Sequence, residues 1–234
     1  MMRVTDPIGG VPNLALYFSN YETYFQGLEH YSYHLQRLIA GYSRGDGVDE
    51  LRRTFSIVVK SVAATQKDST EKFGPSALVF AHKGKYAEIY RNGLVTLCFA
   101  LCLRAGEQEV ATLLQSCERG DPLLEAIVAV AAPEQKHPSA APVFYPYFDL
   151  LYDALSTPEV EREACIAQYL EVWYRDRMKD FSFRDLHLEP DNSAYVGYWC
   201  FEAAGLVAAL AIDDRTFHDH PHYPKDLVAF YRQR

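Results

Sequence analysis

The stretch LYFSNYETYFQGLEHYSYHLQRLIAGYS, residues 16–43, decides the fold class of this 234-residue chain. Its large apolar residues recur at steps of three and four, which places them on one face of an α-helix. These residues are Tyr21, Phe25, Leu28, Tyr31, Leu35, Leu38 and Tyr42. Gly45, Asp46 and Gly47 follow as a helix-breaking cluster. The sequence therefore predicts a long amphipathic helix that ends near Ser43.

The same helical period continues through the rest of the chain in shorter segments. We expect further helices at about 48–71, 86–104, 107–116, 122–130, 144–155, 159–178, 193–210 and from 224 onward. Thr157, Pro158 and Glu159 have the residue types of an N-cap, a first helical position and a first-turn acid. No segment alternates with period two over the length of a strand. The sequence thus predicts an all-α bundle of about eight to nine helices.

Prolines at positions 133, 138 and 142 divide this pattern into two halves. We expect an irregular arm over residues 1–13 and an N-terminal helical subdomain over residues 14–132. A C-terminal helical subdomain over residues 143–234 abuts it. The expected helix at 193–210 is rich in glycine and alanine, which allow helix axes to approach closely.

Composition excludes several classes of function. The net charge is −8 and no basic run is present, which argues against a nucleic-acid partner. The five cysteines are odd in number and form no C-x-x-C pair, so free thiols in a reducing cytoplasm are expected. The chain starts without a hydrophobic signal segment. Its longest apolar stretch, residues 203–212, is too short to span a bilayer. We therefore predict a cytoplasmic protein with no membrane partner.

The negative charge is concentrated in residues 144–191. This segment holds eleven acidic and five basic residues, a net charge of −6, which leaves −2 for the rest of the chain. Such a segment is either a solvated helix face or a docking surface for a basic protein. The candidate contact residues are Asp149, Asp153, Glu159, Glu161, Glu163 and Glu171.

Two clusters have the residue types of a catalytic or metal site. His218, His220 and His222 would share one side of an extended segment and could hold zinc there. Pro221 constrains that turn and no H-E-x-x-H helix supports it, so a loop of solvated histidines is the favoured interpretation. Glu202 lies in an apolar run, where pairing with an arginine or with tyrosine hydroxyls is favoured over a role as a general acid.

Other motifs for chemistry are missing from the sequence. It contains no phosphate-binding glycine loop and no nucleophile elbow, and Cys98 and Cys102 lie within an apolar run that predicts core positions. We therefore expect no catalytic residue, no metal and no cofactor. The oligomeric state stays open.

The C-terminal half resembles a known family. The stretches that carry the resemblance are YLEVWY (169–174), YVGYWCFEAA (195–204), IDD (212–214) and YPKDL (223–227). They resemble the PoNi (polymorphic nuclease immunity) proteins. The family neutralises DNase toxins that secretion systems, such as the type VI system, deliver between competing bacteria. The signature positions are Trp173, Tyr195, Gly197, Tyr198, Trp199, Glu202, Asp213, Asp214, Tyr223 and Pro224.

Most of the signature residues are apolar, aromatic or small, so we expect them in the core. The family pattern also has a second tryptophan after Trp173, and we expect Phe181 or Phe183 in its place. The resemblance implies a cognate nuclease toxin as the partner and one-to-one inhibition by occlusion, without turnover. Two alternatives remain: a metal-dependent hydrolase that uses the three histidines, and a helical scaffold or adaptor without a toxin.

Overall fold

The computed structural model describes residues 14–74, 79, 87–135, 145–191 and 195–233. Within these ranges the chain forms nine α-helices and no strand, which confirms the expected all-α fold. The helices are α1 (Leu14–Arg44), α2 (Val48–Phe73), α3 (Ala87–Cys102), α4 (Glu107–Gln115), α5 (Pro122–Ala131), α6 (Asp149–Ser156), α7 (Glu159–Val172), α8 (Phe201–Leu210) and α9 (Lys225–Arg232).

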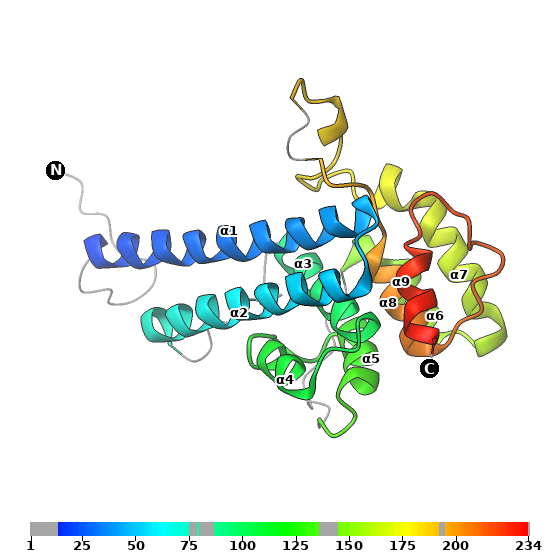
Figure 1. Cartoon of the computed structure of the whole chain (residues 1–234), viewed down its shortest axis with the longest axis horizontal. Coiled ribbons are helices and arrows are strands. Elements are labelled where there is room, and N and C mark those ends of the chain that lie inside the picture. Colours follow the sequence, from blue (N-terminus) through cyan, green and yellow to red (C-terminus); the bar gives the residue numbers. More distant parts are fainter. Residues whose placement is uncertain (1–13, 75–78, 80–86, 136–144, 192–194, 234) are drawn as a thin grey trace.

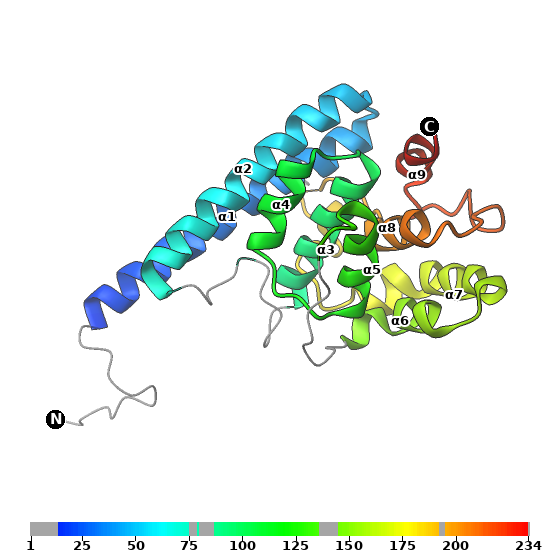
Figure 2. The ribbon, with the colours of Figure 1, turned by 90° about the horizontal axis from the view of Figure 1, so that it is seen from below.

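Helices α1 and α2 form an antiparallel hairpin (Figure 1). Gly45 makes the turn with φ +84°, a conformation that glycine adopts without a steric penalty. The far end of the hairpin, where α1 begins and α2 ends, projects away from the other helices in both Figure 1 and Figure 2. Toward its other end α1 buries Leu28, Tyr31, Leu35 and Leu38, as the periodicity predicts.

Helices α3 and α8 form the centre of the molecule. Every side chain of α3 from Gly93 to Cys102 is buried, because the helix is apolar on all sides. Gly205 of α8 faces Cys98 so closely that a Cβ atom at position 205 would lie 2.1 Å from the cysteine Sγ. The small residues of α8 thus bring its axis close to α3, and both cysteines of α3 are buried as expected.

Asp121 joins three helices of this core. Its carboxylate caps α5 by accepting hydrogen bonds from the backbone N–H groups of Leu123 and Leu124. It also accepts hydrogen bonds of 2.6 Å from Tyr90 of α3 and Tyr152 of α6. The carboxylate is therefore fully bonded although it is buried, and the contact ties α3, α5 and α6 together.

The division into two subdomains stays a prediction. The expected arm over residues 1–13 and the proline-rich boundary beyond residue 135 lie outside the described residues. Helices α3 and α8, which belong to different expected subdomains, pack directly against each other.

Two local predictions are wrong. The helix expected from residue 193 begins at Phe201, and residues 195–200 are not helical. Gly197 has φ +102°, and the backbone N–H of Cys200 donates to the carbonyl of His222 instead of to a helical carbonyl. In addition, Pro158 rather than Thr157 occupies the N-cap of α7, and no side chain caps that end.

The C-terminal end of α7 departs from regular α-geometry. A π-helical turn, Trp173–Arg177, continues the helix, and the backbone N–H of Met178 donates to the carbonyl of Trp173. Helical structure therefore extends to about the predicted limit. The wider turn leaves Trp173 buried against α8 and its neighbours.

Candidate functional site

One of the signature residues, Glu202, forms a buried ion pair with Arg91. Arg91 of α3 and Glu202 of α8 are 3.4 Å apart between Nε and Oε1, with side-chain exposures of 7% and 0%. The indole Nε1 of Trp173 donates a 2.6 Å hydrogen bond to the same Oε1 atom. Glu202 is therefore a structural carboxylate that is paired with an arginine, which was the favoured interpretation of its sequence context.

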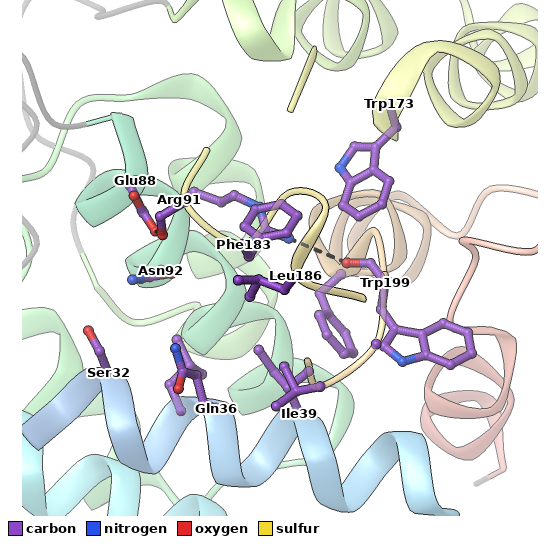
Figure 3. A pocket seen from close by; sticks show the side chains of 15 residues that line it. Ser32, Gln36, Ile39, Glu88, Arg91, Asn92, Trp173, Phe183, Leu186 and Trp199 are labelled. Atoms are coloured by element: carbon purple, nitrogen blue, oxygen red, sulfur yellow. Dashed lines mark hydrogen bonds between the residues drawn. The ribbon is translucent and has the colours of Figure 1, made fainter. Parts of the chain in front are cut away.

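Arg91 also organises the aromatic residues around the pair. Its guanidinium carbon lies 4.5 Å from the ring centroid of Phe183 and 5.8 Å from that of Trp173. The two rings lie 6.1 Å apart at an interplanar angle of 24°. Phe183 therefore packs beside Trp173, whereas the substitution of Phe181 or Phe183 for the family's second tryptophan stays a prediction. Arg91 Nη2 further donates a 3.4 Å bond to the backbone oxygen of Trp199, drawn as a dashed line in Figure 3.

A cavity of about 260 Å³ opens beside Arg91. Figure 3 shows Ser32, Gln36 and Ile39 of α1 along one wall and Trp199 on another. Hydroxyl and amide groups supply most of its polar lining, and Arg91 is already paired with Glu202. Among the described residues, no histidine or cysteine lines the cavity. Ser182 also lines the cavity, and its hydroxyl donates to the carboxylate of Glu88, so the cavity can bind a group with both polar and apolar parts.

Residues 195–199, which we call the 195–199 segment, separate this cavity from an open groove of about 510 Å³. Ser43 of α1 fixes the segment: its hydroxyl donates to the carbonyl of Val196 and accepts a 2.8 Å bond from Trp199 Nε1. A Cβ atom on Gly197 would lie 2.5 Å from the Ser43 hydroxyl. Only glycine therefore allows the segment to approach α1 this closely.

The signature residues divide into two groups. Trp173, Glu202, Asp214, Tyr223 and Pro224 are buried, as expected.

The other signature residues contradict the expectation of a core position. Tyr195 is 41% exposed, and Asp213 is exposed and paired with Arg215. Tyr198 and Trp199 are only half-buried and line the groove with Gly197. Residues 195–199 are not helical, which places Tyr195, Tyr198 and Trp199 at the surface instead of on a buried helix, and Asp213 lies in the loop after α8.

Asp214 links the loop after α8 to the C-terminal helix. It accepts hydrogen bonds from the hydroxyl of Tyr223 at 2.9 Å and from Arg232 Nη1 at 2.7 Å. Burial alone would raise the pKa of the Asp214 carboxyl, but the bonds from Arg232 and Tyr223 together hold it below its ordinary value. The aspartate is thus ionised and structural.

The six candidate contact residues lie on α6 and α7, away from the projecting end of the α1–α2 hairpin (Figure 2). Five of them are exposed and Glu163 is half-buried. Asp149 is paired with Arg177 at 2.8 Å, and Glu171 lies 3.9 Å from His220. Within the described part of the chain, the other four make no ion pair. We call the exposed acidic side of α6 and α7 the acidic face.

The three histidines do not converge on one point. His218 faces Asp214 at 3.7 Å, and His220 faces Glu171 at 3.9 Å. His222 is bonded through Nδ1 to the carbonyl of Tyr198, and its ring lies 5.1 Å from that of Trp173. The three histidines lie in a loop, as expected, and each residue is half-buried instead of fully solvated. Among the described residues, no group of three or more metal-binding side chains lies together.

Sequence reasoning missed the partners of the signature. Arg91 was visible, with Glu88, as a charge at the start of an apolar helix, but its pairing with a residue 111 positions away was not. The role of Ser43 left no signal in the pattern. No helix in the described ranges is both long and apolar enough to cross a membrane.

Comparisons with known proteins agree with this picture. Residues 119–227 match the family model described as PoNe immunity proteins (PoNi), C-terminal. The fold is similar to that of protein PA2201 from Pseudomonas aeruginosa, a crystal structure with 20% identity and a TM-score of 0.67. The alignment covers 92% of this chain and 77% of the other. A comparison with curated proteins gave no match.

The family match includes α5 through α8, the acidic face and all ten signature positions. It confirms the resemblance noted in the sequence, and the structural similarity to PA2201 supports the fold. Residues 119–227 are thus similar to the C-terminal region of the PoNi immunity proteins, as the sequence resemblance predicts.

Proposed function

We propose that this chain binds a cognate DNase toxin in the cytoplasm and inhibits it stoichiometrically, without catalysis. The match of residues 119–227 to the PoNi family supports a nuclease immunity protein that binds a toxin. The observation that carries the finer proposal is the acidic face. Asp153, Glu159 and Glu161 are exposed there without an ion-pair partner among the described residues. Their charge is available to a protein of opposite sign.

The physical argument rests on charge complementarity. A DNase needs a positive surface to hold the phosphates of its substrate. An acidic surface that occupies or borders this region competes with DNA for the same positive groups. Opposite potentials also accelerate association above the roughly 10⁵–10⁶ M⁻¹s⁻¹ of uncharged protein pairs. Rapid capture suits a protein that must intercept a nuclease already inside the cell.

Val160 gives the acidic face an apolar centre. It is 88% exposed and stands between Glu159 and Glu161 at the start of α7. An exposed aliphatic residue with a carboxylate at each neighbouring position of the same helical turn could supply an apolar contact within a charged interface. The first turn of α7 is therefore the part of the face that we expect to contact the toxin.

The role of the acidic face can be tested by reversing the charge of three of its residues and comparing this variant with a control in which three acidic residues elsewhere are reversed. In the first variant, Asp153, Glu159 and Glu161 are replaced by lysine. The control replaces Asp68, Glu107 and Glu134, which are exposed residues on or after other helices.

Association with the purified cognate nuclease is measured at several salt concentrations. We expect the face variant to associate at least about tenfold more slowly and with a flatter salt dependence than the control. Equal rates for the two variants would refute the role of this face. In cells, co-expression of the wild-type chain should rescue growth from the nuclease, and a chain that gives no rescue would contradict the proposed function itself.

A further inference from the structure

The open groove beside the 195–199 segment has the features of a docking site. Its walls come from the C-terminal end of α1, the 195–199 segment and the loop that holds Pro221 and His222. Tyr195, Tyr198 and Trp199 supply its aromatic surface. Tyrosine and tryptophan are the residues most enriched at the energetic centres of protein interfaces, because they contribute a large contact area with few rotatable bonds.

The groove is preorganised. The ring of Tyr195 lies 4.8 Å from that of Tyr198 and 6.1 Å from that of His187. The hydroxyl of Tyr198 lies 2.6 Å from Nδ1 of His187. Together with the contacts of Ser43 to this segment, these interactions hold the aromatic rings before a partner arrives. These side chains therefore lose little conformational entropy when a partner binds the groove.

The charges around the groove favour a basic occupant. The one arginine among its lining residues, Arg44, is paired with Asp46 at 2.5 Å. One carboxylate lies close by: Glu171 is 3.9 Å from His220, whose ring is 5.6 Å from that of His222 in the groove wall.

Near Tyr198, Asp185 accepts a 2.7 Å bond from Tyr174 and is paired with Arg184 at 3.3 Å, so Glu171 is the carboxylate without an arginine or lysine partner among the described residues. Electron-rich rings with carboxylates nearby attract an arginine or a lysine over the ring face.

We propose that this groove receives an arginine- or lysine-bearing segment of the nuclease toxin, with Tyr195 as the principal anchor. The inference rests on the proposed function, because it assigns a contact to the same partner. It extends the interface from the acidic face to the aromatic groove. Glu171 belongs to both surfaces, since it lies on α7 and reaches His220 beside the groove.

Three substitutions at one position test the anchor. Tyr195→Ala removes the ring, Tyr195→Phe removes only the hydroxyl, and Tyr195→Leu keeps an apolar side chain without a ring face. Tyr33→Ala is the matched control, because Tyr33 is 56% exposed on α1 and lines neither the groove nor the cavity. Tyr195 is exposed enough that its loss should leave the thermal unfolding temperature close to that of the wild type.

Dissociation from the purified cognate nuclease is the measured quantity. We expect Tyr195→Ala and Tyr195→Leu to dissociate at least about tenfold faster, and Tyr195→Phe and Tyr33→Ala to stay within about threefold of the wild type. Dissociation of Tyr195→Leu at the wild-type rate would overturn the basic occupant. Dissociation of Tyr195→Ala at the wild-type rate would overturn the groove as a contact and leave the proposed function intact. A wild-type chain that does not bind the nuclease would overturn both.

Discussion

Replacing Glu202 with glutamine tests the buried pair that supports the signature residues. Glutamine has nearly the same shape as glutamate and can still accept the hydrogen bond from Trp173 Nε1. The substitution therefore leaves packing almost unchanged and removes one charge. Arg91 keeps its positive charge in a position where its side chain is only 7% exposed.

The expected cost follows from this geometry. Breaking a buried ion pair on one side costs about 3–5 kcal/mol, because the remaining charge is left without compensation. The separations between Arg91 and Glu202 are long at 3.4 Å, and Arg91 keeps its stacking on Phe183. We therefore expect the lower end of the range, about 3 kcal/mol. In a chain of this length each kcal/mol lowers the melting temperature by about 2–4 °C, so Tm should fall by about 6–12 °C.

Urea denaturation followed by circular dichroism measures the free energy of unfolding for a double-mutant cycle. The cycle contains Glu202→Gln, Arg91→Met and the double variant. Each single variant leaves an unmatched buried charge, whereas the double variant leaves no buried charge, so its loss should be smaller than the two single losses combined by about 1–2 kcal/mol. A loss below about 1 kcal/mol for Glu202→Gln, or single losses that add within about 0.5 kcal/mol, would refute the reasoning.

Three further predictions concern packing, the groove and pH. Gly205→Ala should destabilise the fold by about 1–3 kcal/mol in urea denaturation, because the new methyl group overlaps Cys98, and adding Cys98→Ala should restore part of the loss. Ser43→Ala should cost about 1–2 kcal/mol and shift tryptophan emission to longer wavelength, since Trp199 Nε1 loses its acceptor; an unchanged spectrum would contradict this. The lowered pKa of Asp214 contributes stability above the unfolded pKa of about 3.9, and this is lost as pH falls through the folded pKa. The stability difference between wild type and Asp214→Asn should therefore be largest near neutral pH and shrink below about pH 4, and a constant difference would argue against it.

The sequence predicted the helices well wherever a three- and four-residue period continued without interruption. The face of α1 that contains Tyr31, Leu35 and Leu38 is buried as the period requires. The prediction failed at residues 195–200, where an aromatic run fits a buried helix and an extended surface segment equally well. Gly197 decides between them, because its positive φ and its contact with Ser43 exclude a helix. Neither fact can be read from neighbouring residues.

The negative charge of α6 and α7 could be predicted from the sequence, but the ion pairs and the groove could not. Charge counting located the acidic face on α6 and α7, because helices of this length leave their charged residues at the surface. It could not show that Asp149 is matched by Arg177. The groove could not be predicted from the sequence for a different reason. Its walls come from α1 and from residues more than 150 positions later, and Ser43 bonds to both Val196 and Trp199. Contacts of this sequence separation require the tertiary structure.

The two surfaces should control different steps of toxin capture. Charges act over a distance of about 10 Å at moderate salt, so the acidic face affects the encounter before any side chain touches the toxin. An aromatic anchor acts only in contact, and so the groove affects mainly how long the complex lasts. Reversal of Glu159 and Glu161 should therefore slow association, whereas Tyr195→Ala should speed dissociation, and the combined variant should show both changes at nearly their separate sizes. High salt should mask the first effect and leave most of the second. If instead both substitutions changed only the association rate, the groove would be part of the electrostatic surface and not an anchor.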